Sequence, residues 1–152
     1  MTDQRVAGLV WKEEDGIPFI LTHTPAKSSI ENYSVTTVTG TLKIGNNALT
    51  TMANTMFEHL GIERSRIIEE HIMSKPMESL SKVYRWYFMK IDTRTTITMC
   101  PTEIQDYSWN PPAQIPLVME KMRAGRRYMF EQALAEACKR NIFQKAQFPF
   151  LQ

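Results

Sequence analysis

The polar side chains of one predicted helix are the first candidates for chemistry in this sequence. Between Leu49 and Leu60, apolar residues recur at i, i+3, i+4, i+7 and i+8, which predicts an amphipathic helix. Residues three and four apart are neighbours on a helix surface, so one polar face is expected to carry Thr51, Asn54, Thr55, Glu58 and His59. A magnesium ion prefers oxygen ligands, and carboxylates above all. This face offers one carboxylate, so it predicts a poor magnesium site.

Glu58 and His59 admit two interpretations. Glu58 could ligate a metal, and the imidazole of His59 would suit a softer metal such as Zn²⁺ or Mn²⁺ better than Mg²⁺. Alternatively, His59 is a polar residue that the helix dipole favours near a C-terminus, and Glu58 is a solvated charge.

Other kinds of catalytic site find little support in the sequence. His23, His59 and His71 have no serine or cysteine nucleophile beside them in a recognisable turn, and no glycine-rich phosphate loop occurs. Cys100 and Cys138 lie far apart without ligands at zinc spacing, so neither a zinc site nor a disulfide framework is expected.

Strands before the helix must position it. Residues 5–12 and 19–24 are apolar and β-branched, with turn residues between them, which predicts a hairpin. Residues 33–40 are rich in Val and Thr and predict a third strand. Asn46 or Asn47 is the expected N-cap of the helix, and Gly61 suits its left-handed C-terminal position.

The second half of the chain predicts three more strands, a surface connection and two helices. The strands are expected at residues 66–73, 81–92 and 93–100, the proline-rich connection at 101–116, and the helices at 115–122 and 125–143. This order indicates an α/β (α+β) fold in which a mixed sheet lies between helices, an α/β/α sandwich.

Composition limits the class of protein. The chain has 152 residues, 43% hydrophobic and 22% charged, which is typical of one globular domain spanning 1–152. No apolar run is long enough to cross a bilayer, and the N-terminus does not resemble a secretory signal, so a cytoplasmic protein is expected. The net charge of +2 does not by itself indicate nucleic acid. The basic run at 121–127 could contact phosphates, but a solvated helix end is the commoner role.

The segment from Gly40 to Ile62 resembles the Nudix box, whose pattern is G-x5-E-x7-R-E-U-x-E-E-x-G-U with U an aliphatic residue. The frame matches without a gap: Gly40, Met56, Glu58, Gly61 and Ile62 take the glycine, aliphatic and first paired-glutamate positions. The remaining charged positions of the pattern differ, because this sequence has Asn46, Asn54, Thr55 and His59 there. Residues 81–92, 103–122 and 126–137 resemble the elements that follow the box in the family.

This resemblance implies a Nudix-like fold whose pyrophosphate-binding metal site has lost most of its carboxylates. By the same resemblance, Glu103 and Asp106 lie in a loop over the site, where Glu103 could join Glu58 in rebuilding it. Mg²⁺ or Mn²⁺ is expected as a cofactor only in that case. Family members are often homodimers, which makes a homodimer a further expectation.

Aromatic and basic residues are the candidates for ligand contacts. Tyr84, Trp86 and Phe88 alternate along one predicted strand and so share a face, where they could stack on a base or pack in the core. Trp109 could likewise stack on a ligand or plug its loop. With Asn54 and His59, the expected substrate-binding residues are Arg85, Trp86 and Trp109, with the basic run 123–127 as a further contact.

Three functions remain open on the sequence alone. The first is a module that binds a nucleotide, a nucleotide-sugar or RNA without ordinary magnesium-dependent hydrolysis. The second is an active hydrolase of nucleoside-diphosphate-linked substrates that uses Glu58, Glu103 and His59 with an unusual metal. The third is a structural partner in a homodimer.

Overall fold

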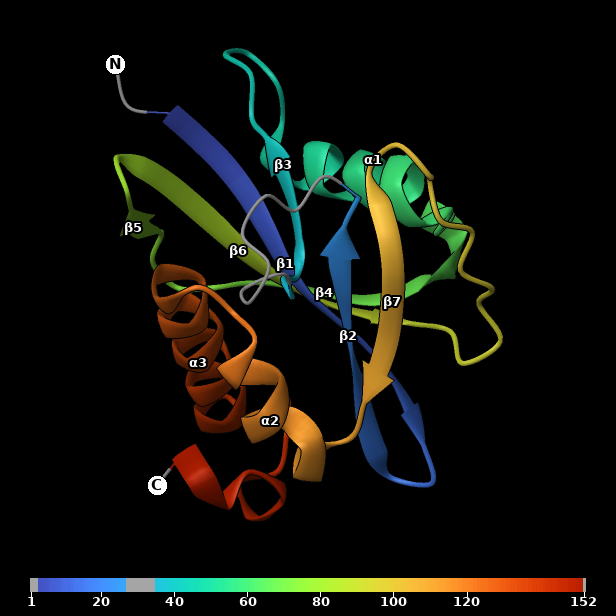
Figure 1. Cartoon of the computed structure of the whole chain (residues 1–152), viewed down its shortest axis with the longest axis vertical. Coiled ribbons are helices and arrows are strands. Elements are labelled where there is room, and N and C mark those ends of the chain that lie inside the picture. Colours follow the sequence, from blue (N-terminus) through green and yellow to red (C-terminus); the bar gives the residue numbers. More distant parts are fainter. Residues whose placement is uncertain (1–2, 27–34, 152) are drawn as a thin grey trace.

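The computed structural model describes residues 3–26 and 35–151, and a seven-stranded mixed sheet forms its centre (Figure 1). The strands are β1 (Asp3–Glu14), β2 (Ile17–Pro25), β3 (Val38–Thr41), β4 (Ile67–Ile72), β5 (Met77–Ser79), β6 (Lys82–Ile91) and β7 (Ile104–Asn110). The α-helices are α1 (Ala48–Leu60), α2 (Ile115–Glu120) and α3 (Ala124–Lys139). Single 3₁₀ turns occur at Arg64–Arg66, Pro112–Gln114, Lys145–Gln147 and Pro149–Leu151.

Strand β1 organises the sheet. The strand order is β4-β6-β1-β2-β7, with β3 paired to β1 and β5 paired to β6. The β1–β6 pair is parallel, and the other pairs are antiparallel. Since β6 occupies one edge of β1, the opposite edge is shared: β3 pairs with Arg5–Gly8 and β2 with Trp11–Glu14. The sheet therefore divides between β2 and β3, and an isolated bridge joins His23 of β2 to Thr36, just before β3.

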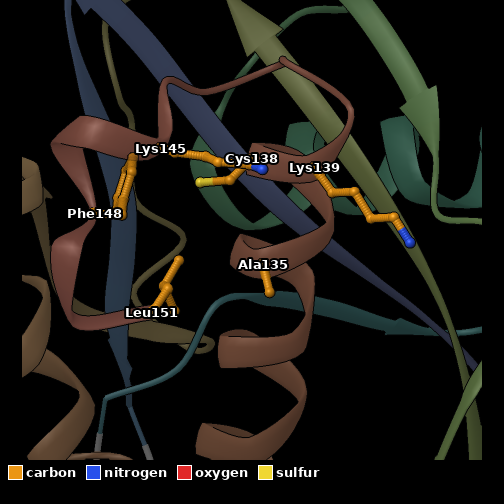
Figure 2. A pocket seen from close by; sticks show the side chains of 6 residues that line it. All are labelled: Ala135, Cys138, Lys139, Lys145, Phe148 and Leu151. Atoms are coloured by element: carbon orange, nitrogen blue, oxygen red, sulfur yellow. The ribbon is translucent and has the colours of Figure 1, made fainter.

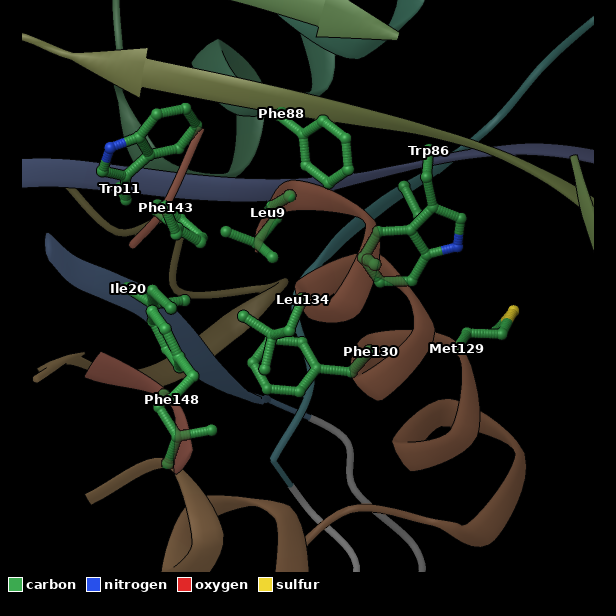
Figure 3. Packing of buried hydrophobic residues seen from close by; sticks show 14 of the residues in the cluster. Leu9, Trp11, Ile20, Trp86, Phe88, Met129, Phe130, Leu134, Phe143 and Phe148 are labelled. Atoms are coloured by element: carbon green, nitrogen blue, oxygen red, sulfur yellow. The ribbon is translucent and has the colours of Figure 1, made fainter. Parts of the chain in front are cut away.

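Helices cover both faces of the sheet (Figure 1). On one face, α2 and α3 enclose a cluster that includes Leu9, Trp86 and Phe130 (Figure 3). On the other face, α1 closes a second cluster around Met52 and Met56. Each fully buried side chain of this size contributes about 1.5–3 kcal/mol to stability. The α/β/α sandwich expected from the sequence is confirmed.

Local signals at the hairpin and at α1 are confirmed. Strands β1 and β2 form the antiparallel hairpin, and Asp15 and Gly16 in its turn have positive φ angles of 52° and 78°. Asn47 is the N-cap of α1, since its side chain accepts a hydrogen bond from the backbone N–H of Thr50 at 3.0 Å. Gly61 ends the helix with φ of 67°, and its N–H donates to the carbonyl of Phe57.

The strand predicted for residues 93–100 is wrong. These residues form no strand, although their content of Thr favours one. Their backbone instead satisfies the end of α1: the N–H of Thr98 donates to the carbonyl of Leu60 at 2.8 Å, and that of Cys100 to the carbonyl of His59 at 2.9 Å. The segment thus supplies partners for helix carbonyls that would otherwise lack them.

The proline-rich connection predicted for residues 101–116 is also wrong, because it contains β7. This strand pairs with β2 along Ile20–Pro25, and the prolines at 101 and 111 lie outside it, where they do not interrupt the ladder. The short strand β5 was not predicted. The predicted third strand begins later than expected, at Val38, and its first two residues, 33 and 34, lie outside the described residues.

The two C-terminal helices are confirmed as α2 and α3. Among the helices that the structure describes, none has the length and apolar character needed to cross a bilayer.

Candidate functional site

The polar face of α1 lines a hollow of about 310 Å³ between the helix and β3. Its lining residues are Gly40, Thr41, Lys43, Asn46, Thr51, Asn54, Thr55, Glu58 and His59. We call this hollow the α1 pocket. Its side chains comprise one carboxylate, one ammonium group, one imidazole, two amides and three hydroxyls. The polar face predicted from helical periodicity therefore does form one continuous surface.

A close approach of β3 to α1 shapes the pocket. A Cβ atom on Gly40 would overlap the side chain of Thr55, so only glycine permits this separation. The Thr55 hydroxyl donates to the carbonyl of Thr51 at 2.8 Å, and the Thr51 hydroxyl to the carbonyl of Asn47 at 2.9 Å. Both hydroxyl protons are thus used within the helix. The donors left for a ligand include the Lys43 ammonium, the amide groups of Asn46 and Asn54, and the Thr41 hydroxyl.

Glu103 lies beside the C-terminal end of α1. Its Oε2 is 4.0 Å from Nε2 of His59, and its side chain is 55% exposed. The hydrogen bonds from residues 98 and 100 to the end of α1 hold the preceding segment in place. Asp106 is engaged locally, because its Oδ1 accepts from the backbone N–H of Tyr107 at 2.8 Å. The structure thus brings Glu103 to His59 but gives Asp106 another partner.

These residues do not fit a magnesium ion. Mg²⁺ requires near-octahedral oxygen ligands, and the α1 pocket contributes the single carboxylate of Glu58. Within residues 3–26 and 35–151, no three His, Cys, Asp or Glu side chains gather closely enough to hold a metal ion. Glu103 adds a carboxylate near His59 rather than completing a ligand set.

His23 is a buried polar residue that the sequence did not indicate as part of a site. It lies on β2, where its backbone exchanges two hydrogen bonds of 2.9 Å with Thr36, and the residue is 6% exposed. Its Nδ1 has no hydrogen-bond partner among the described residues. Burial chiefly lowers the pKa of His23 from 6.5 to about 4, with smaller contributions from His59 and Arg126. The His23 imidazole is therefore neutral at pH 7.

Three expected ligand contacts lie away from the α1 pocket. Trp86 is 0% exposed and packs in the core under α3, so its ring offers no surface to a base (Figure 3). Trp109 is half-buried, and the ammonium of Lys12 lies 4.6 Å from its ring centroid. Arg85 is exposed on β6, in register with Val6, whose other neighbour is Gly40. Two strand spacings, about 10 Å, thus separate Arg85 from Gly40.

Asn54, Glu58 and His59 are the expected site residues that the structure does bring together. Lys43, Asn46 and Thr41 complete the lining but were not proposed as ligand contacts. The available signal was their position between Gly40 and the N-cap of α1, since residues at a helix N-terminus often meet anions.

Two further hollows lie near the C-terminus and are mainly apolar. One, of about 420 Å³, lies between α3 and the last 3₁₀ turns, and is lined by Ala135, Cys138, Lys139, Lys145, Phe148 and Leu151 (Figure 2). Burial raises the pKa of the Cys138 thiol, which makes it a poor nucleophile. The other, of about 570 Å³, is lined largely by prolines and apolar side chains, including Pro112, Pro149 and Phe150. Neither hollow presents a group of catalytic side chains.

Solved structures with the same arrangement of sheet and helices identify the fold. A MutT protein from Methanosarcina mazei Go1 superposes with a TM-score of 0.65 over 88% of this chain and 94% of its own, at 20% sequence identity. This chain has the Nudix fold. The Nudix domain of Shewanella oneidensis NrtR, in complex with ADP ribose, gives a TM-score of 0.65 at 10% identity, over 92% of this chain and 88% of that one.

An Ap4A hydrolase from C. elegans is similar at a TM-score of 0.63 and 13% identity, over 88% of this chain and 98% of its own. No family model and no curated protein sequence matches this chain. At these identities, the Nudix likeness establishes the fold alone, and the function must be argued from the residues of the α1 pocket.

Proposed function

We propose that this chain is a cytoplasmic binding module that takes a nucleotide-type ligand in the α1 pocket and lacks ordinary magnesium-dependent hydrolysis. The proposal is based on the composition of the pocket, which contains one carboxylate together with hydrogen-bond donors and neutral polar groups. In this view, the Nudix box is degenerate, and the polar face of α1 is no longer a metal site.

Phosphate oxygens suit such a pocket without a bridging metal. They are acceptors, and the Lys43 ammonium with the amides of Asn46 and Asn54 supplies donors. Glu58 is the one group in the pocket that would repel a polyphosphate at close range. A site that bound the polyphosphate through a metal would instead need several such carboxylates. The NrtR domain of the same fold binds ADP ribose, and the Ap4A hydrolase acts on another nucleotide with a phosphate chain. ADP-ribose is therefore a suitable first probe.

Calorimetry with ADP-ribose tests the proposal. We expect saturable binding in EDTA that Mg²⁺ does not strengthen, and no release of AMP. Lys43→Met should weaken binding about 10-fold or more, since a charge-assisted contact to phosphate is lost. Lys75→Met changes an exposed lysine outside the pocket and should leave the affinity within about twofold. Binding that requires Mg²⁺, or an equal loss in both variants, would contradict the proposal.

Restoring carboxylates tests the proposed loss of catalysis. In a protein without turnover, Thr55→Glu with His59→Glu should create magnesium-dependent hydrolysis if the missing carboxylates were decisive. The single variant His59→Glu is the matched control, because it adds one carboxylate and leaves the buried contact between Thr55 and Gly40 intact.

A metal-dependent hydrolase remains the alternative, and the proximity of Glu103 to His59 favours it. In that case Glu58, Glu103 and His59 would hold Mn²⁺ or another metal softer than Mg²⁺. The wild-type protein would then hydrolyse a nucleoside-diphosphate-linked substrate in Mn²⁺, and Glu58→Ala would abolish the turnover. Such a result would overturn the binding-module proposal.

Two further partners belong to the proposal. RNA could replace a small nucleotide, and a single-stranded oligonucleotide titrated in the same calorimetric experiment distinguishes the two.

A homodimer could form along β4, an edge strand on which Ile68 and Ile72 are 56% and 52% exposed. Sedimentation velocity tests this, and Ile72→Lys should shift a dimer toward the monomer.

A further inference from the structure

The beginning of α3 carries an arginine that does not behave as the solvated residue expected from the sequence. The guanidinium of Arg126 lies over the ring of Tyr84, with 5.3 Å between its central carbon and the ring centroid. Its Nη1 is buried and has no hydrogen-bond partner among the described residues. A buried donor of a charged group costs free energy unless a partner satisfies it.

Further positive charge surrounds Arg126. Burial chiefly lowers its pKa, and the charges of Arg123 and Arg5 lower it further. Arg5 is the neighbour of Tyr84 across the β1–β6 pair, and Arg123 directly precedes α3. Arg5 and Arg126 are therefore both neighbours of Tyr84 on the α3 side of the sheet, and Arg123 lies close enough to Arg126 to act on its charge.

One carboxylate in this region is already engaged. The Asp3 carboxylate pairs with Arg5, with 2.8 Å between Oδ2 and Nη2, which neutralises one cation. The first turn of α3 contains no acidic residue, and no side chain caps its N-terminus. No ion pair of Arg123 or Arg126 is found in the described part of the chain. Within residues 3–26 and 35–151, the guanidinium groups of Arg123 and Arg126 and the positive end of the α3 dipole thus have no paired anion.

We propose that Arg126, together with Arg123, forms a binding site for a phosphate monoester group at the start of α3, next to Tyr84. A dianion matches the two free guanidinium charges, and guanidinium groups hold phosphate through directed pairs of hydrogen bonds. The Tyr84 ring holds Arg126 in place through a cation–π contact.

This site is distinct from the α1 pocket. Arg5 and Tyr84 face the α3 side of the sheet, whereas Gly40 faces α1 and lies against Thr55. None of the three arginines lines the α1 pocket. The proposal therefore does not depend on the function proposed for that pocket.

Titration with inorganic phosphate, followed by NMR of the arginine Nε–H signals, tests the site. The Arg126 signal is assigned by its loss in Arg126→Met. We expect this signal in the wild-type protein to shift and saturate with phosphate, while an equal ionic strength of NaCl leaves it unchanged. Arg123→Met replaces an exposed side chain that makes no cap, so the fold should persist, and it should weaken phosphate binding about 10-fold.

Two controls separate this site from the α1 pocket and from general charge effects. Arg94→Met removes an exposed arginine that follows the opposite end of β6, and should leave the phosphate affinity at Arg126 within about twofold. Lys43→Met should also leave it unchanged, although it weakens ADP-ribose binding. An Arg126 signal that does not saturate, or that titrates identically in Arg123→Met, would overturn the proposal whatever the fate of the nucleotide.

Discussion

At the scale of single residues, His23 links burial to acid sensitivity. Its pKa is about 4 in the folded protein and 6.5 as the ordinary value. Between these values the unfolded chain takes up a proton that the folded chain does not. The contribution of His23 to the free energy of unfolding is therefore fully present above pH 6.5 and decreases as the pH falls. Near pH 4, the free energy of unfolding is lower by about 3 kcal/mol because of this group.

His23→Gln should remove this part of the pH dependence. Urea denaturation at pH 7 and pH 4.5 should show a smaller fall in the free energy of unfolding for the variant than for the wild-type protein, by about 2–3 kcal/mol. Lys75→Met is the control and should fall as the wild-type protein does. If the free energy of unfolding of His23→Gln falls as much between pH 7 and pH 4.5 as that of the wild-type protein, His23 is not a buried neutral group.

Residue type also shows what the sequence could and could not predict about the site. Asn54, Glu58 and His59 were predicted to share a face, because helical periodicity fixes which side chains are neighbours. Alternation along β6 likewise predicted that Trp86 and Phe88 share a face, but not whether a helix or a ligand covers it. The packing of α3, which is remote in the sequence, decides that point in favour of the core.

At the scale of elements, the contact between β3 and α1 is tight enough for a double-mutant test. Gly40→Ala should destabilise the protein by about 1–3 kcal/mol, since its Cβ overlaps Thr55. Thr55→Ala removes the hydroxyl and methyl groups that cause most of this overlap, so adding it should recover about 1 kcal/mol or more.

Gly45→Ala is the matched control for that cycle. Gly45 has a φ of 87° and open space around it, so the substitution should cost about 1 kcal/mol through backbone strain alone. It should show no coupling to Thr55→Ala. Urea denaturation measures all of these variants, and additive effects of Gly40→Ala and Thr55→Ala would contradict the tight packing.

Neighbouring asparagines at the start of α1 separate stability from binding. Asn47→Ala should cost about 1 kcal/mol, because it removes the cap on the N–H of Thr50. Asn46→Ala should change stability by less than about 0.5 kcal/mol and instead weaken ADP-ribose binding, since Asn46 lines the α1 pocket. Thermal unfolding and calorimetry on both variants check this, and a loss of binding confined to Asn47→Ala would contradict it.

The elements that the sequence mispredicted share a physical cause. β-Branched residues predicted a strand at 93–100, but the exposed carbonyls at the end of α1 recruit its backbone. Prolines suggested a loop at 101–116, but they lie before and after β7 and do not interrupt it. In both cases a tertiary partner decided the conformation, and local propensity could not reveal that partner. The helices were predicted correctly, since their hydrogen bonds are local.

At the scale of the whole molecule, the two core clusters share the same sheet. Side chains of β1 and β6 alternate between the α3 side and the α1 side, so loss of either cluster exposes strands that the other requires. We infer that residues 1–152 form one domain, which unfolds in a single cooperative transition.

Substitutions on the two faces test this inference. Phe130→Ala on the α3 side should cost about 3–5 kcal/mol and Met56→Ala on the α1 side about 2–5 kcal/mol, since both side chains are fully buried. Phe57→Ala is the control on α1 and should cost little, because Phe57 is 57% exposed. Tryptophan fluorescence and far-UV circular dichroism should report one coincident urea transition in each variant. Trp11 and Trp86 lie on the α3 side and Trp109 packs on the α1 side, so separate transitions would be detectable and would show that the faces unfold independently.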